Sequence, residues 1–216
     1  GFTYVQQEPT VNVKIRTLAF TRLALIGDKS TLEYLREQLD LLRAFPDCIG
    51  AFNPNIRASA FIALMRFCDP CDTENLLSMY IELYNKCDSP AVKVELLRGM
   101  GATLDRNVLL KALAFTFESQ SVRTQDRAYV LLAVHQSNAE TVWNYIMKNW
   151  DTLVSQLSKG GMSMFENVVT YPMYLLKDTN VKQIVQRFLN QKLSDVASFS
   201  NSIEQEFETV DKAIQW

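Results

Sequence analysis

The sequence contains little glycine and proline, at 7 and 6 of its 216 residues. An all-β sandwich or barrel uses both residue types at its many turns, so the composition disfavours such a fold. No apolar run approaches the ~20 residues that a membrane-spanning helix needs, and residues 1–4 lack the basic and apolar regions of a secretory signal. The formal net charge is only −2, which gives no strong field for nucleic acid. We therefore expect no membrane segment and no nucleic-acid partner.

Histidine is equally scarce, because His135 is the only one. The zinc-binding motif His-Glu-x-x-His needs two histidines one helical turn apart, so this chain cannot supply it. A Ser-His-Asp relay would need a Gly-x-Ser-x-Gly turn after a strand, and neither is present. We expect His135 to lie near a helix C-terminus, where it complements the helix dipole. The sequence assigns no catalytic residue.

The four cysteines are Cys48, Cys68, Cys71 and Cys87. The Cys68-Asp69-Pro70-Cys71 spacing suits half of a zinc site or a redox pair, but a structural zinc site usually needs two such pairs. We predict a loop between helices with two incidental thiols, and no metal site in this chain. A Cys68–Cys71 disulfide in an oxidising compartment is one alternative. An unrelated enzyme centred on His135 or on these thiols is another.

Apolar residues recur with helical spacing almost throughout, most clearly over 139–157. In this segment Asn138 is the predicted N-cap and Gly160-Gly161 the predicted end. Further helices are predicted at 10–26, directly after Ser30, and at 55–67, 74–86, 90–99, 106–117, 122–136, 163–176, 180–192 and 200–216. The predicted N-caps are Ser30 for the helix that follows it, Thr73 for 74–86, Asp105 for 106–117, and Asp178 or Thr179 for 180–192. Pro172 is expected to break the helix at 163–176.

No segment alternates with period two for long enough to form a strand, so the predicted fold class is all-α. Short connections make successive helices antiparallel neighbours. About eleven helices in hairpins cannot all surround one core, so we expect them to stack as a HEAT- or armadillo-like α-solenoid. A compact irregular bundle is the alternative architecture.

Several short blocks occur in an order that resembles one known family. They are Asn55-Ile56-Arg57-Ala58-Ser59, Leu97-Arg98-Gly99-Met100-Gly101-Ala102-Thr103-Leu104, Val122-Arg123-Thr124-Gln125-Asp126, Trp143, Asn149-Trp150-Asp151-Thr152-Leu153, Gly160-Gly161 and Ile214-Gln215-Trp216. Together they resemble the C-terminal helical domain of zinc aminopeptidases, in the puromycin-sensitive and aminopeptidase N group.

That resemblance implies a single C-terminal-type domain over residues 1–216, with the catalytic domains absent. Such a domain would be non-catalytic by itself, would wall the peptide-binding cavity and would regulate substrate access. The parent enzyme would remove N-terminal amino acids from peptides, with its zinc in an upstream catalytic domain and no cofactor in this chain. The implied partners are that upstream domain and peptide substrates. The puromycin-sensitive branch favours a cytoplasmic parent, although the sequence leaves localisation open.

Arg123, Gln125 and Asp126 are the candidate substrate-facing residues. Arg123 and Asp126 stand three residues apart in a first helical turn, so their side chains can pair, and Asp126 also complements the helix dipole. The functional interpretation is that Arg123 or Gln125 contacts a peptide's backbone or carboxylate; the alternative is a purely structural pair. Trp143 and Trp150 belong to the core. A free-standing HEAT-like adaptor that binds a partner protein is the alternative function.

Overall fold

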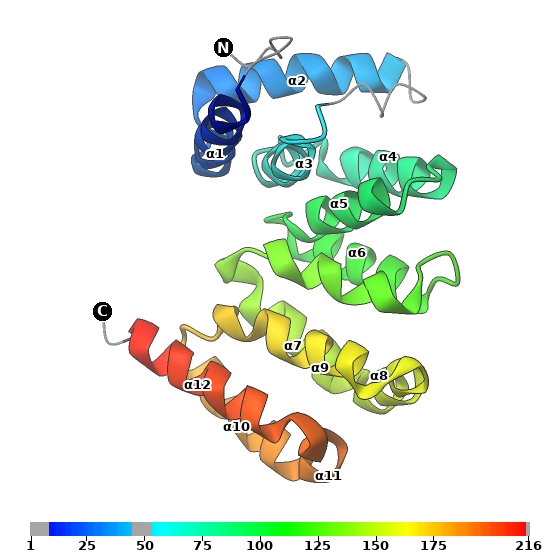
Figure 1. Cartoon of the computed structure of the whole chain (residues 1–216). Coiled ribbons are helices and arrows are strands. Elements are labelled where there is room, and N and C mark those ends of the chain that lie inside the picture. Colours follow the sequence, from blue (N-terminus) through cyan, green and yellow to red (C-terminus); the bar gives the residue numbers. More distant parts are fainter. Residues whose placement is uncertain (1–8, 45–52, 215–216) are drawn as a thin grey trace. The chain divides into compact units, whose positions relative to one another are not determined.

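The computed structural model describes residues 9–44 and 53–214, and within these ranges every regular element is a helix. The prediction of an all-α fold is confirmed for this part of the chain. The chain divides after residue 102 into two compact units, and Figure 1 labels their helices. None of the described helices combines the length and the apolar character that crossing a membrane requires. The blocks at Gln215-Trp216 and Cys48 lie outside the described residues.

The described residues of unit 1 form five helices, and four of them pack around the fifth, α3. Their bounds are α1 Thr10–Ile26, α2 Lys29–Ala44, α3 Arg57–Arg66, α4 Thr73–Lys86 and α5 Pro90–Gly101. Helix α3 contacts the other four, and its closest packing is with α5. One face of α2 is buried in the core, and it carries Leu32, Leu35, Leu39 and Leu42.

Two residues turn the chain between α1 and α2. Gly27 adopts φ 78°, the left-handed conformation that ends a helix and suits glycine. Asp28 is then the N-cap of α2, because its carboxylate accepts bonds from the Thr31 backbone N–H and from the Ser30 and Thr31 hydroxyls. The prediction that Ser30 caps this helix is therefore wrong: a carboxylate two residues earlier accepts the bonds.

The cap of α4 also differs from its prediction. Thr73 is the first residue of the helix and not its cap, and its hydroxyl donates to the Asp69 carbonyl at 3.0 Å. Asp72 precedes the helix, and its carbonyl accepts the first intrahelical bond from Leu76. The Asp72 carboxylate accepts from Arg43 Nη2 of α2 at 2.6 Å, so the start of α4 is tied to the end of α2.

The core of unit 1 depends on a close approach of three helices at Gly99. A Cβ at this position would lie 2.8 Å from the Phe61 Cβ of α3 and 2.9 Å from the Tyr80 ring of α4. The two rings meet edge to face at 5.3 Å, and the Tyr80 hydroxyl donates to the Phe61 carbonyl at 3.1 Å. The helix predicted at 90–99 continues past this contact, since α5 ends at Gly101.

Unit 2 is built from short α-helices and 3-10 segments. Their bounds are α6 Arg106–Glu118, η2 Thr124–Ala133, η3 Gln136–Asn138, α7 Ala139–Lys148, α8 Trp150–Leu157, η4 Ser158–Gly160, α9 Met162–Thr170, η5 Tyr171–Leu175, α10 Thr179–Gln191, α11 Leu193–Val196, η6 Ala197–Phe199 and α12 Ser200–Ile214. Trp143 and Trp150 are both buried in its core, as predicted. The Trp150 ring packs edge to face against Phe165 and Phe188, with centroids 5.0 Å away in each case.

Several predicted boundaries in unit 2 change in the structure. The segment 139–157 is two helices that meet at Asn149, and 122–136 is mainly a 3-10 helix. Asn138 does not cap α7; its buried amide donates to the Thr103 carbonyl at 3.0 Å instead. The break at Pro172 is confirmed, because α9 ends at Thr170 and a 3-10 segment follows. Asp105 and Asp178 cap α6 and α10 through two backbone N–H groups each, as predicted.

Candidate functional site

The three candidate residues lie at the start of η2. Asp126 is buried, with 3% of its surface exposed, whereas the Arg123 side chain is 46% exposed. Arg123 Nε donates to Asp126 Oδ2 at 2.7 Å, and Arg123 Nη2 forms an ion pair with the same oxygen at 2.6 Å. The predicted Arg123–Asp126 pair is thus confirmed, and it fixes the guanidinium at the protein surface.

The pair leaves part of the guanidinium available. An arginine carries five N–H donors in a planar fork, and no described residue bonds Arg123 Nη1. Gln125 is exposed beside it, and no described side chain holds its amide. Donors of this kind match the carbonyl and carboxylate oxygens of a peptide. Whether they meet one stays a prediction.

Arg127, next to the candidate residues, was not singled out by the sequence. It is buried, and its guanidinium donates to the Phe117 and Ser119 carbonyls at 2.8 and 3.1 Å and to Gln156 Oε1 at 2.7 Å. Phe117 lies in the last turn of α6, which has no basic residue of its own there. Arg127 therefore supplies the positive charge that this helix end favours.

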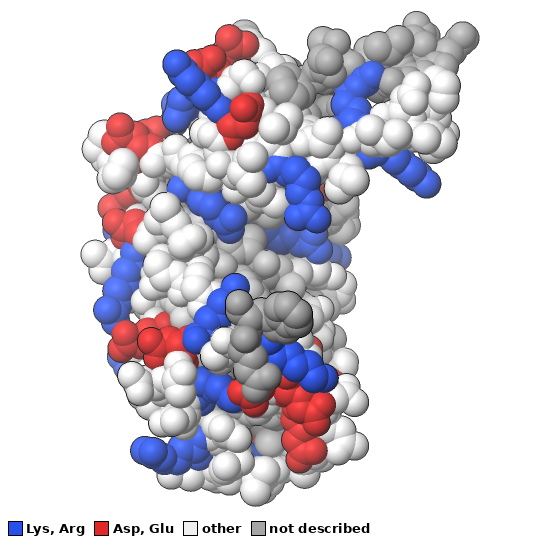
Figure 2. All heavy atoms as spheres, turned by 90° about the vertical axis from the view of Figure 1, so that its left-hand side faces the viewer, with Lys and Arg blue, Asp and Glu red and all other residues white. Residues whose placement is uncertain are grey.

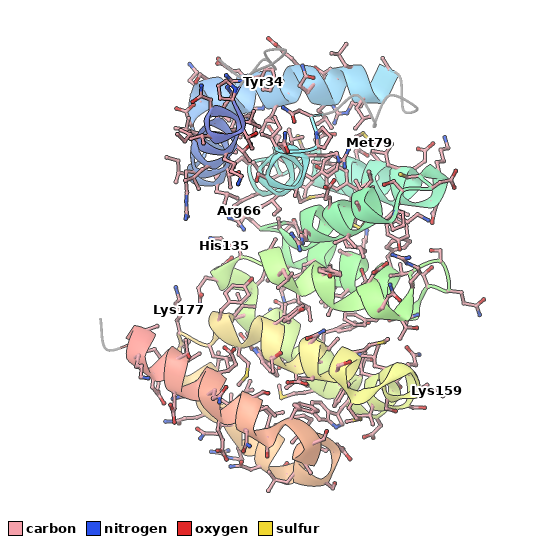
Figure 3. All side chains as sticks on the ribbon, viewed as in Figure 1. Tyr34, Arg66, Met79, His135, Lys159 and Lys177 are labelled. Atoms are coloured by element: carbon pink, nitrogen blue, oxygen red, sulfur yellow. The ribbon has the colours of Figure 1, made fainter. Side chains whose placement is uncertain are left out.

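His135 lies in the short link between η2 and η3 (Figure 3). Its Nδ1 accepts from the Ser137 backbone N–H at 3.2 Å and contacts the Ser137 hydroxyl at 2.9 Å. It therefore caps the beginning of η3, two residues after η2 ends at Ala133. That it also complements the end of η2 stays a prediction. An arrangement in which histidine bonds its own neighbouring turn gives no support to a catalytic relay.

The thiols of the Cys68–Cys71 segment are free, and the segment is a turn between α3 and α4, as predicted. Partial burial and then the Asp72 charge raise the pKa of Cys68. The hydrogen bond from Cys71 Sγ to Asp69 raises the pKa of Cys71. A reactive cysteine needs the opposite shift, toward thiolate. The alternative of an enzyme centred on these thiols therefore has no support.

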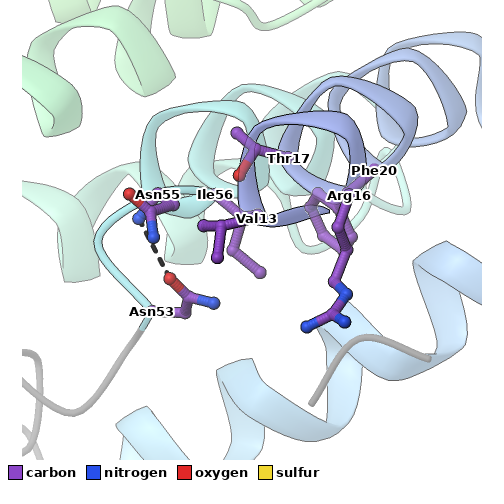
Figure 4. A pocket seen from close by; sticks show the side chains of 7 residues that line it. All are labelled: Val13, Arg16, Thr17, Phe20, Asn53, Asn55 and Ile56. Carbon is purple, nitrogen blue, oxygen red and sulfur yellow. Dashed lines mark hydrogen bonds between the residues drawn. The ribbon is translucent and has the colours of Figure 1, made fainter. Parts of the chain in front are cut away.

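Two pockets of unit 1 hold no chemistry of their own. One, lined by Val13, Arg16, Thr17, Phe20, Asn53, Asn55 and Ile56, has a volume of about 20 Å³ (Figure 4), which is room for about one water molecule. The other, about 470 Å³, lies beside Cys68 between α2, α3 and α4. Three of its charged residues are already engaged with one another, since Arg43 bonds both Asp40 and Asp72.

Charge and metal-ligand patterns add no further site. Within 9–44 and 53–214, no three His, Cys, Asp or Glu side chains gather as a metal ion would require. The described residues thus do not fit a zinc centre. Lys and Arg are interspersed with Asp and Glu on the face shown in Figure 2, and neither sign covers it continuously.

Comparison with known proteins gives one consistent family. The family described as the ERAP1-like C-terminal domain matches residues 1–212. Aminopeptidase M1-B of rice is 23% identical over 231 residues, which is all of this chain and 24% of that protein. Aminopeptidase 2 of Candida albicans is 23% identical over 222 residues, covering all of this chain and 23% of the relative. The mitochondrial Aminopeptidase 2 of Saccharomyces cerevisiae is 28% identical over 145 residues, covering 66% of this chain and 15% of that protein.

The chain thus spans about a quarter of the length of the first two relatives. The family match extends over nearly all of it, through both compact units. These findings bear out the resemblance drawn from the ordered sequence blocks. The chain belongs to the family of ERAP1-like C-terminal domains, the helical C-terminal domains of aminopeptidases.

Proposed function

We propose that this chain is the non-catalytic C-terminal domain of a zinc aminopeptidase that removes N-terminal amino acids from peptides. The observation that carries the proposal is the family match over residues 1–212, together with relatives that are aminopeptidases of about four times this length. The zinc and the residues that bind it would belong to the upstream catalytic domain. The match to aminopeptidases also favours a domain of an enzyme over a free-standing adaptor.

In this proposal residues 1–216 form one domain, which walls the peptide-binding cavity and regulates entry to it. Helices joined by short links, such as α1 and α2 across Gly27 and Asp28, support an arrangement of stacked antiparallel hairpins. A HEAT-like stack of such hairpins forms a curved surface suited to enclosing an extended ligand. The domain would contribute shape and a few polar contacts, and no reacting group.

Arg123, Gln125 and Asp126 are the proposed contact with peptide. Asp126 is buried and accepts one hydrogen bond from Arg123 within an ion pair, so it would hold the guanidinium in one orientation. The remaining Arg123 donors and the Gln125 amide would then bind the backbone or the terminal carboxylate of a peptide that extends beyond the catalytic centre. Such a contact affects long substrates only, because a single aminoacyl group does not reach it.

The test compares substrates of different length in the full-length enzyme. We expect Gln125→Ala and Arg123→Lys to raise KM for peptides while kcat/KM for an aminoacyl-anilide stays unchanged. Lysine keeps the charge beside Asp126 but loses the planar fork of donors. Arg106→Ala, at an exposed arginine with no described partner, is the matched control. Equal effects on both substrate types would contradict the proposed contact.

An activity assay on the isolated chain tests whether catalysis belongs to the upstream domain alone. Incubated with zinc and an aminoacyl-anilide, it should release no product, whereas the full-length protein should. Turnover by the chain alone that a chelator abolishes would overturn the proposal. So would a full-length protein that cleaves no peptide.

A further inference from the structure

Helix α1 is apolar on two opposite sides. Phe20 and Ala24 face the core of unit 1 and are buried. Four other apolar side chains are largely exposed: Val11 at 65%, Ile15 at 60%, Leu18 at 59% and Ile26 at 75%. A helix face with several large apolar side chains is normally buried, and the described residues of unit 1 cover only one of these two sides.

The exposed residues form a single stripe. At about 100° per residue, Val11, Ile15, Leu18 and Ile26 fall within roughly 80° of arc, on the side away from Phe20. Single exposed apolar residues are common on soluble proteins. A continuous stripe along most of a 17-residue helix indicates instead a surface that another protein surface covers.

The stripe has a charge at its middle that selects the covering surface. Arg22 lies within the same arc, and none of the described residues bonds or pairs with it. Helix α1 carries Lys14, Arg16 and Arg22 and has no acidic residue. Covering the stripe would take water away from Arg22, which is costly unless the covering surface supplies a carboxylate. The fitting partner is therefore apolar with an acidic group opposite Arg22.

Chain length indicates where that partner comes from. Relatives are about four times as long as this chain, and α1 is the first helix of the described residues. An upstream region of a longer polypeptide would be tethered on the N-terminal side of α1, and such a tether gives a partner a high effective concentration. A partner held this way needs little intrinsic affinity, which suits a stripe of moderate size.

We propose that the outer face of α1, formed by Val11, Ile15, Leu18, Arg22 and Ile26, is the docking surface for the upstream region of the same polypeptide. The docked surface is apolar and presents a carboxylate to Arg22. This inference rests on the proposed function, because that function supplies the upstream region. Beyond that function, the inference names the face of the domain that makes the contact and the chemical groups on the opposing surface.

Hydroxyl-radical footprinting with mass spectrometry tests the proposal on the full-length protein and on this chain alone. Leu41 of α2 is the matched reference, since it lies in the same unit and is 56% exposed, against 59% for Leu18. We expect modification of Leu18 and Ile15 to fall several-fold in the full-length protein relative to the chain, while Leu41 stays equally reactive in both.

Variants separate docking from local effects. In the full-length protein, Leu18→Ser and Arg22→Glu should restore the reactivity of Ile15, whereas Leu41→Ser should not. In the isolated chain all three should leave the far-ultraviolet circular dichroism unchanged, because these side chains are exposed there. If Leu18→Ser restored the reactivity of Ile15 but Arg22→Glu did not, the proposal that the docked surface presents a carboxylate to Arg22 would be overturned.

Three results would overturn the docking surface. Leu18 equally reactive in both proteins would show that nothing upstream covers it. Protection in the isolated chain that disappears on dilution would assign the stripe to a second copy. Protection only with phospholipid vesicles would assign it to a membrane surface. Peptide cleavage is measured separately, so an inactive protein with α1 protected refutes the proposed function alone, and an active protein with α1 reactive refutes docking alone.

Discussion

Arg127 is a buried cation whose partners are mainly backbone carbonyls. It bonds Phe117, Ser119 and the Gln156 side chain, and so joins the end of α6 to η2 and α8. Phe117 is buried, and Ser119 and Gln156 are partly buried, so losing these bonds would leave acceptors with fewer partners, which is costly. At the scale of single residues, this side chain contributes more to the local fold than the candidate residue Arg123, which is half exposed.

We predict that Arg127→Met lowers the free energy of unfolding by roughly 2–4 kcal/mol, because methionine fills the space but leaves the carbonyls without donors. Urea denaturation monitored by circular dichroism measures the change. Arg106→Met, at an exposed position that starts α6, is the control and should change stability little. A similar small effect at Arg127 would show that water replaces its hydrogen bonds.

Asp28 gives a dependence on pH. Hydrogen bonds from Ser30, from the Thr31 backbone and from the Thr31 hydroxyl lower the pKa of its carboxyl below the usual value of 3.8. A carboxyl whose folded pKa is lowered stabilises the fold at pH values above its unfolded pKa, and that contribution is lost as pH falls through the folded pKa. The stability that Asp28 contributes is therefore lost as the pH falls below about 4.

Asp28→Asn keeps the acceptor oxygen but does not titrate. We expect the stability of the natural chain relative to this variant to decline as the pH is lowered from 5 to 2, measured by thermal unfolding. A stability difference that stays constant across this range would mean that Asp28 has the same pKa folded and unfolded.

At the scale of elements, the close contact at Gly99 sets how α3, α4 and α5 pack. Helix propensity alone favours alanine over glycine by about 1 kcal/mol. A Cβ at Gly99, however, would lie within 3 Å of both Phe61 and Tyr80. We predict that Gly99→Ala destabilises the chain, by roughly 1–3 kcal/mol, because overpacking exceeds the gain in propensity. Denaturant midpoints decide the sign, and a stabilised variant would contradict the close approach.

The sequence predicted helices well where apolar spacing or a capping aspartate marked them. Asp105 and Asp178 show this, since each capped its helix as expected. One of the failed predictions has a partner distant in sequence as its cause. Asn138 reads as a cap, but its amide bonds Thr103, 35 residues away. The end of α7 at Asn149 was missed because the apolar stripe continues across it.

The same distinction applies to the candidate site. The Arg123–Asp126 pair follows from a spacing of three residues, so the sequence alone indicated it. Arg127 was missed because its partners lie on α6 and α8, which no local pattern joins to η2. What faces Gln125 depends on a surface outside this chain, so its role stays a prediction.

At the scale of the whole molecule, the chain forms two compact units within one family domain. The sequence predicted a single domain over 1–216, and that stays a prediction. The division concerns how the chain is packed, and whether the units unfold together is a separate property. Their separate cores give the means to measure it.

All three tryptophans, Trp143, Trp150 and Trp216, belong to unit 2, and unit 1 has none. Indole emission therefore reports on one half of the polypeptide, whereas the helical signal at 222 nm sums both halves. We expect the two signals to change at the same urea concentration if the halves melt as one cooperative block. An ellipticity transition that begins while the emission is still native would assign the first unfolding step to the tryptophan-free half. The two signals together would then report separately on the unfolding of each half.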